Sequence, residues 1–405
     1  MKVTFAILGG LLSASAFAND CAVSNVADML TCGKVEGSLR INSYSLNNAY
    51  FASTSQDTTT AGGYATYKTA PFYGVTAGVG IEGQRRLAQG AHNVSELSQH
   101  TFGLGEAYIN WTHDLFSITA GNQKLNLPFV GDYSIYRVQP WLYQGVDAKY
   151  GDTDNFVRLT KVNKYKSYGD DDFSKSNRLN DDPYSGYSSR TDGLTALGLG
   201  KKFDLPNQYI KGQFWVEHYS DLLNLYYGEV NIGFKQTPWQ PEISLQSIYG
   251  TDTQDAKLGN INSKSFGAQV KVKPTPALTW RVGYDHVVKD TNSAWLEGSL
   301  PTPYAHNTSS DPYFAQPFFT STQDLGAGNF YTTEVTSPLG EHLFAGSRLT
   351  YADTNKDMYE LMFYGFYNFS GRFKGLSLSE FVGAQKQQSN GHPFLQNRLA
   401  LSYNF

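Results

Sequence analysis

The last nine residues, Asn397-Arg398-Leu399-Ala400-Leu401-Ser402-Tyr403-Asn404-Phe405, decide the fold class. Every second position is apolar, from Leu399 to the final Phe405, and polar or small residues lie between. Successive side chains of a β-strand point to opposite faces, so this alternation predicts a strand with one apolar and one polar face. Both a soluble β-sandwich and a transmembrane β-barrel contain such strands, so features elsewhere in the chain must distinguish between these two fold classes.

The amino terminus indicates export. Lys2 precedes an apolar stretch at residues 5–12, and Ala16-Phe17-Ala18 is a small-x-small cleavage site. These features predict a signal peptide over residues 1–18. The apolar stretch is far shorter than the ~20 residues that a membrane-spanning helix needs. In an exported chain, an alternating last strand that ends on Phe405 is typical of outer-membrane barrels, which present this strand to their assembly machinery.

The composition favours a membrane barrel over a soluble domain. The chain has 28 Tyr, 25 Phe and 39 Gly but only 4 Met, and 17% of its residues are charged. Soluble domains have about 25% charged residues, whereas barrels carry aromatic girdles at both membrane interfaces. The net charge of -4 and the lack of a basic cluster give no support for nucleic-acid binding.

Both cysteines lie near the start of the mature chain. Cys21 and Cys32 are eleven residues apart in an exported protein, which predicts a disulfide rather than a metal site. The disulfide would close a short periplasmic segment, residues 19–35, ahead of a barrel formed by residues 36–405.

The same period of two recurs along the chain and predicts amphipathic strands of about 8–11 residues, long enough to cross a bilayer at barrel tilt. Segments of this kind include 38–44, 106–111, 146–150, 210–217, 266–272, 278–285 and 343–351. Short links rich in proline and glycine alternate with long polar links, chiefly Asn163 to Gly193 and Asp290 to Asn329. Eighteen strands fit the chain length, and sixteen fit nearly as well.

Several short motifs, in order, resemble the OprD family of outer-membrane porins. They are Ser38-Leu39-Arg40-Ile41-Asn42-Ser43-Tyr44, Leu104-Gly105-Glu106-Ala107-Tyr108-Ile109-Asn110, Thr119-Ala120-Gly121-Asn122-Gln123, Asn126-Leu127-Pro128-Phe129, Tyr136-Arg137-Val138-Gln139-Pro140, Tyr143-Gln144-Gly145-Val146 and Phe373-Lys374-Gly375-Leu376-Ser377-Leu378. The resemblance implies an all-β fold, a transmembrane antiparallel β-barrel of eighteen strands. It also implies a third extracellular loop that folds inward from about Leu127 and returns near Trp141.

The resemblance further implies basic residues along the pore wall that guide carboxylate-bearing solutes. Here acidic residues are mixed with them, which weakens the expected anion preference. Tyrosines in the inward loop are candidates for stacking. The candidate lining and constriction residues are Arg40, Glu106, Tyr108, Tyr133, Tyr136, Arg137, Asp147, Lys149, Arg158, Lys211, Lys271, Arg281, Arg348 and Arg398.

These observations predict a porin in the outer membrane of a Gram-negative cell, through which small hydrophilic solutes, such as amino acids, organic acids and small peptides, diffuse passively. An oligosaccharide-selective pore and a surface adhesin with a closed lumen are the alternatives. The eight His residues lack metal-ligand spacing, and we expect no enzyme, metal or cofactor. The expected partners are the lipid bilayer, lipopolysaccharide, the barrel assembly machinery and, in a homotrimer, further copies of the chain.

Overall fold

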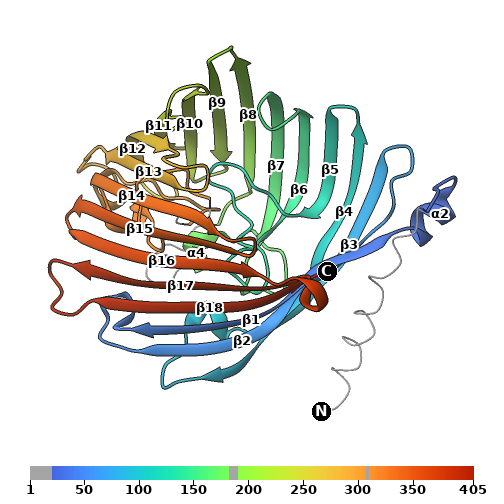
Figure 1. Ribbon diagram of the computed structural model, residues 1–405, viewed down its shortest axis with the longest axis horizontal. Coiled ribbons are helices and arrows are strands. Elements are labelled where there is room, and N and C mark those ends of the chain that lie inside the picture. Colours follow the sequence, from blue (N-terminus) through green and yellow to red (C-terminus); the bar gives the residue numbers. More distant parts are fainter. Residues whose placement is uncertain (1–20, 182–189, 307–309) are drawn as a thin grey trace.

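The computed structural model describes residues 21–181, 190–306 and 310–405, so the predicted signal peptide lies outside the described residues. Within these ranges the chain forms one sheet of eighteen strands (Figure 1). The strands are β1 Lys34–Asn47, β2 Gln56–Lys68, β3 Val75–Gln89, β4 Thr101–His113, β5 Phe116–Gln123, β6 Leu142–Gly151, β7 Phe156–Lys166, β8 Leu194–Asp204, β9 Gln208–Tyr219, β10 Leu223–Phe234, β11 Glu242–Asp252, β12 Asn262–Val272, β13 Thr279–Val287, β14 Gly328–Leu339, β15 Leu343–Thr354, β16 Met358–Asn368, β17 Leu376–Gln387 and β18 Phe394–Asn404.

The sheet closes on itself into a barrel. Each strand pairs antiparallel with the next along the chain, and β1 pairs with both β2 and β18. Figure 1 shows β1 lying between these two strands. The last residue extends the closure, because the main chains of Phe405 and Gly37 exchange two hydrogen bonds of 3.0 and 3.1 Å. The barrel therefore has the eighteen strands that the family resemblance implies.

The apolar face of each strand points outward. On β1 the side chain of Ile41 is 44% exposed, whereas that of the next residue, Asn42, is 0% exposed. On β18 Leu399 and Leu401 are exposed and Arg398 is buried. A soluble sandwich would bury the apolar face instead. The wall is thus apolar toward lipid and polar toward the lumen, as expected for a barrel in a membrane.

The connections at the two ends differ in length. Short turns join β2 to β3, β8 to β9 and β16 to β17 at one end, and long loops span residues 167–193 and 288–327 at the other. The helices lie outside the strands, mostly in these connections: α2 Val26–Thr31, η2 Ala49–Phe51, α3 Ser95–Ser98, α4 Arg178–Asp181, η3 Leu296–Gly298, α5 Thr322–Leu325 and η5 Gly371–Phe373. Among the described residues, no helix is long and apolar enough to cross a membrane.

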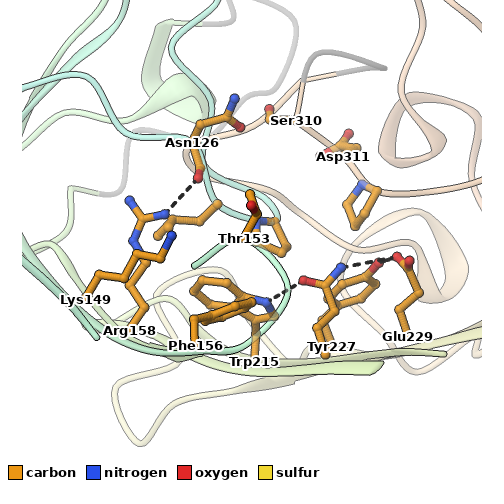
Figure 2. A pocket seen from close by; sticks show the side chains of 14 residues that line it. Asn126, Lys149, Thr153, Phe156, Arg158, Trp215, Tyr227, Glu229, Ser310 and Asp311 are labelled. Atoms are coloured by element: carbon orange, nitrogen blue, oxygen red, sulfur yellow. Dashed lines mark hydrogen bonds between the residues drawn. The ribbon is translucent and has the colours of Figure 1, made fainter. Parts of the chain in front are cut away.

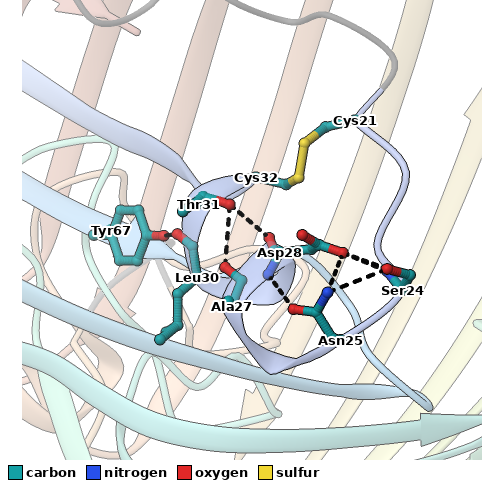
Figure 3. The surroundings of a disulfide bond; sticks show 9 residues. All are labelled: Cys21, Ser24, Asn25, Ala27, Asp28, Leu30, Thr31, Cys32 and Tyr67. Carbon is teal, nitrogen blue, oxygen red and sulfur yellow. Dashed lines mark hydrogen bonds between the residues drawn. A yellow bond between two sulfur atoms is a disulfide. The ribbon is translucent and has the colours of Figure 1, made fainter.

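The segment before the barrel is tied to the end that carries the short turns. Cys21 and Cys32 form a disulfide on either side of α2 (Figure 3). The Asn25 side chain caps α2 by accepting a hydrogen bond from the main chain of Asp28, 3.0 Å away. The hydroxyl of Tyr67, on β2, donates to the carbonyl of Leu30. These contacts hold α2 against the link between β2 and β3.

Part of β4 lacks a neighbouring strand on one side. β5 ends at Gln123 and β6 begins at Leu142, so β4 extends beyond its partner, and residues 101–106 have no β5 strand beside them. Side chains take over the missing hydrogen bonds. Asp171 accepts from the main-chain N–H of Phe102 at 2.8 Å, and the Lys166 ammonium donates to the carbonyl of Leu104 at 2.8 Å. In a wall without access to water, these contacts satisfy main-chain groups that would otherwise lack partners.

The Lys166 side chain also lies 3.0 Å from the Glu82 carboxylate on β3, and both side chains are 1% exposed. Removing one member of a buried ion pair leaves the other charge uncompensated and costs about 3–5 kcal/mol. We therefore expect Lys166→Met to lower the free energy of unfolding by about this amount, measured by urea titration of the refolded barrel.

The double variant Glu82→Gln, Lys166→Met is the control. It removes both charges, so it should recover most of the lost stability. Equal destabilisation in the single and double variants would contradict a role for this ion pair in closing the wall.

Candidate functional site

The third long-loop connection, residues 124–141 (L3), lies inside the barrel. The Arg40 guanidinium donates to the carbonyl of Arg137 at 2.8 Å, and the Tyr44 hydroxyl donates to the carbonyl of Tyr136 at 2.5 Å. Asn42 donates to the same Tyr136 carbonyl at 3.2 Å. Arg40, Asn42 and Tyr44 occupy the lumen face of β1, opposite the exposed Ile41. L3 is therefore held against the inner wall.

The loop between β13 and β14, residues 288–327 (L7), enters the lumen as well and contacts L3. The main chain of Phe129 donates to the carbonyl of Ser310 at 2.9 Å, and that of Gly131 donates to the carbonyl of Tyr304 at 3.2 Å. The hydroxyls of Tyr133 and Ser310 lie 3.1 Å apart. The family resemblance implies that the third loop folds inward, and the structure places L7 inside the barrel as well.

Polar groups of the wall hold L7 in place. The Asp285 carboxylate accepts from the main chain of Ala315 at 2.5 Å, and the Glu360 carboxylate accepts from that of Phe318 at 2.5 Å. Arg348 donates to the carbonyl of Gln316 at 2.6 Å. These wall residues come from β13, β15 and β16, on the side of the barrel opposite β4 to β6. The two loops together therefore bridge the lumen.

Glu96, in α3, joins two of the predicted arginines. Its carboxylate lies 2.5 Å from Arg137 of L3 and 2.8 Å from Arg398 of β18, and all three side chains are nearly buried. Burial raises the pKa of Glu96, but the two guanidinium groups lower it by more, so its pKa lies below the ordinary value of 4.5. The same ion pair outweighs burial and raises the pKa of Arg137. Glu96 thus fixes the end of L3 to the wall.

Most of the other predicted basic residues on the wall are paired with carboxylates. Arg158 binds Asp147 through two nitrogens, at 2.8 and 3.1 Å. The remaining pairs join Lys211 to Asp154 at 2.6 Å, Lys271 to Glu242, and Arg281 to Glu334 at 2.8 Å. Local neutralisation of this kind reduces the charge that a passing solute meets.

Arg40 and Lys149 are different, because neither forms an ion pair with a described residue. Both side chains lie on the lumen face and are partly exposed. On the acidic side, the Glu106 carboxylate is 4.0 Å from Lys124 and accepts from Thr66 at 3.0 Å. The Tyr108 side chain follows Glu106 on the same face of β4 and is partly exposed.

The fourteen candidate residues thus fall into two groups. Ten lie on the lumen side and are partly exposed: Arg40, Glu106, Tyr108, Tyr136, Asp147, Lys149, Arg158, Lys211, Lys271 and Arg281. Four are 2–8% exposed and pack under the loops, so they do not line an open lumen: Tyr133, Arg137, Arg348 and Arg398. Tyr133 and Arg137 belong to L3 itself, and L7 covers Arg348 and Arg398 through Gln316 and Phe319.

Sequence reasoning missed Glu96, Asp285 and Glu360 as residues that hold the inner loops. Their partners are distant in sequence, and Glu96 and Arg398 are 302 residues apart. No local pattern signals such contacts. Among the described residues, no group of three His, Cys, Asp or Glu side chains could hold a metal ion.

The fold is shared with solved porin structures. OpdK from Pseudomonas aeruginosa has a TM-score of 0.74 at 15% identity, over 93% of this chain and 99% of its own. OccAB4 from Acinetobacter baumannii has a TM-score of 0.74 at 18% identity, over 92% and 98%. A BenF-like porin from Pseudomonas fluorescens Pf-5 has a TM-score of 0.76 at 16% identity, over 93% and 99%. At these identities the likeness shows the fold alone.

No curated protein sequence matches this chain. Residues 115–405 match the model of the outer membrane porin, OprD family. The matched part includes β5 to β18, L3 and L7, whereas the motifs at 38–44 and 104–110 lie before it. The match covers well over half of the sequence, and the closed eighteen-stranded barrel agrees with it. The chain belongs to the OprD family of outer-membrane porins.

Proposed function

We propose that this porin lets small hydrophilic solutes that bear a carboxylate diffuse passively across the outer membrane. Arg40 and Lys149 carry the proposal, because they are lumen-facing cations without an ion-pair partner among the described residues. A fixed charge on the wall of a narrow pore concentrates solutes of opposite charge and sets selectivity. Arg40 also contacts L3, so its charge lies beside the loop that narrows the lumen.

Most of the other charged side chains in the lumen have ion-pair or hydrogen-bond partners. Arg158, Lys211, Lys271 and Arg281 face carboxylates of the wall or its turns. Carboxylates exposed to the lumen would favour cations, but those of Asp285 and Glu360 accept hydrogen bonds from main-chain N–H groups of L7. The preference for anions is therefore modest and depends on a few residues. One similar structure is that of OpdK with vanillate, a carboxylate, which agrees with this substrate class.

The proposal includes the partners expected from the sequence. The exposed apolar wall meets lipid and lipopolysaccharide, the segment around α2 faces the periplasm, and the assembly machinery recognises β18 and Phe405. A homotrimer belongs to the proposal as well. The partly exposed ring of Phe156, whose centroid lies 5.6 Å from that of the buried Trp215, favours the oligosaccharide-selective pore as the second candidate, because sugars stack on such rings.

Single-channel recording in planar bilayers tests the proposal. We expect discrete conductance steps and a reversal potential that indicates weak anion preference in asymmetric salt. Arg40→Gln should shift the reversal potential toward cation preference, because it removes an unpaired positive charge from the lumen. Lys201→Gln, which removes a lysine from the outer face of β8, should leave the reversal potential unchanged.

Arg40→Lys is the control for charge, because it keeps the positive charge but removes the guanidinium group that contacts L3. An unchanged reversal potential in Arg40→Gln would contradict the proposed role of Arg40. A folded barrel that never conducts would contradict the channel itself and leave the adhesin alternative.

Acid should release L3. The pKa of Glu96 is lower in the folded barrel than in the unfolded chain, so its ionised form stabilises the fold above the ordinary value of about 4.5. This contribution is lost as the pH falls through the lower, folded value. We expect quiet conductance at neutral pH and enlarged or fluctuating conductance only below about pH 4.5.

Glu96→Gln should produce this fluctuating conductance already at neutral pH, because it removes the charge that pairs with Arg137 and Arg398. Glu380→Gln is a matched control, because Glu380 lies on β17 without an ion pair to a described residue. Identical recordings for Glu96→Gln and the unmodified porin would rule out the proposed anchor.

A further inference from the structure

A cavity of about 400 Å³ lies between the inner loops and the wall formed by β6 to β10. Asn126, Leu127 and Pro128 of L3 and Ser310, Asp311 and Pro312 of L7 cover it on one side. Side chains of β6, β7, β9 and β10 form the other side. Figure 2 shows Lys149 and Arg158 at one end, Glu229 at the other, and the rings of Phe156 and Trp215 between them.

Two glycines shape the floor of this cavity. Gly198 and Gly200 lie on the lumen face of β8, between Phe156 of β7 and Trp215 of β9. A Cβ atom on Gly198 would lie 2.5 Å from the Trp215 ring, and one on Gly200 would lie 2.2 Å from the Phe156 ring. The missing side chains allow both rings to lie across β8. Trp215 is buried and supports the ring of Phe156, which is partly exposed and forms an apolar floor for the cavity.

Hydrogen bonds and strand pairing fix this apolar floor. The Trp215 indole N–H donates to Gln213 at 3.0 Å, which sets the orientation of the ring. Lys149, Arg158, Gly198, Trp215 and Tyr227 are direct neighbours across five adjacent strands. Phe156, Gly200, Gln213 and Glu229 are direct neighbours in the adjacent row, so the cation and the carboxylate lie at the ends of two neighbouring rows.

The cationic end has one available charge. Arg158 is neutralised by Asp147, which also accepts from the Thr160 hydroxyl at 2.7 Å. Lys149, on β6, is the direct neighbour of Arg158 on β7 and forms no ion pair with a described residue. Its ammonium group is thus free to bind a carboxylate of a ligand.

The acidic end mirrors this arrangement. The Glu229 carboxylate accepts from the Asn231 amide at 2.5 Å, from the Gln213 amide at 3.4 Å and from the Tyr227 hydroxyl. All three donors are neutral, and Glu229 forms no ion pair with a described residue. The Glu229 carboxylate therefore lacks a positively charged partner, and the ammonium group of a ligand can fill this role.

We propose that this cavity binds short zwitterionic peptides with an apolar or aromatic side chain. Their carboxylate would meet Lys149, their ammonium would meet Glu229, and their side chain would lie on the partly exposed ring of Phe156, which Trp215 supports. This inference rests on the proposed function, because the cavity is part of the same lumen. It adds a defined binding site on the wall below L3 and L7.

The spacing of the charges favours peptides over free amino acids. Lys149 and Glu229 are four strands apart, about 19 Å along the wall, so a ligand that meets both charges must be extended. A peptide of two or three residues spans about 7–11 Å. A free amino acid carries both charges on one residue and can reach only one end.

Current block by Ala-Phe-Ala in single-channel recordings tests the inference. We expect the free tripeptide to block the wild-type channel for resolvable times. Amidation of its carboxyl terminus or acetylation of its amino terminus should each shorten the block about tenfold, as expected for one lost contact between opposite charges.

Variants assign each end of the peptide. In Lys149→Gln the block should be short, and amidation should have no further effect, although acetylation still does. In Glu229→Gln the block should also be short, but acetylation should have no further effect, although amidation still does. Lys201→Gln, on the outer face of β8, should behave like wild type. Equal effects of amidation in wild type and Lys149→Gln would overturn the proposed orientation.

The apolar floor has its own pair of variants. Gly198→Ala should displace the Trp215 ring and shorten the block by Ala-Phe-Ala more than that by Ala-Ala-Ala. Gly212→Ala is the control, because its Cβ would lie 3.6 Å from the nearest atom. Maltotriose that blocks as long as the peptide would overturn the peptide assignment in favour of sugar stacking.

Two outcomes separate this inference from the proposed function. Normal conductance without any block by Ala-Phe-Ala would overturn only the peptide site. A silent barrel would overturn the channel, and calorimetric titration of the peptide into the detergent-solubilised barrel would then decide the site independently. Failure of Lys149→Gln and Glu229→Gln to weaken the calorimetric affinity would overturn it.

Discussion

The structure depends on one constraint, the need of every main-chain N–H and C=O group in the wall to find a partner without water. An unsatisfied group in hydrocarbon costs several kcal/mol, so a sheet can cross the bilayer only if it is closed. The pairing of β1 with β18, continued by Phe405 and Gly37, provides this closure. Where β5 and β6 stop short, Lys166 and Asp171 replace strand partners with side chains.

A closed wall encloses a polar lumen, and two loops of the same chain, L3 and L7, occupy part of it. L3 and L7 bring main-chain amides into the lumen, and these amides need acceptors just as the wall does. Asp285, Glu360 and Glu96 meet this need or pair with arginines of the loop and wall. Charged residues that appear from sequence to line a pore therefore serve largely as anchors. The few that remain unpaired determine the field that a solute meets.

The period of two explains why so much of the fold was predictable. It assigns the lumen face of each strand locally, so Arg40, Lys149, Lys211, Lys271 and Arg281 were placed on that face from sequence alone. The number of strands followed from length and turn spacing only to within two. The anchors were not predictable, because Glu96 meets Arg137 and Arg398 across 41 and 302 residues. Their positions depend on how the loops fold back, which leaves no local periodic signal.

One local signal was present and was not used. Gly198 and Gly200 are two positions apart on a strand, so they remove side chains from the same face. A pair of this kind marks a shallow furrow, and its neighbours across the sheet here are the large rings of Phe156 and Trp215. The partly exposed ring of Phe156 offers an apolar contact on one side of a ligand, and Lys149 and Glu229 offer one charge each. Transport needs this balance, since a site must bind strongly enough to recruit a solute and weakly enough to release it.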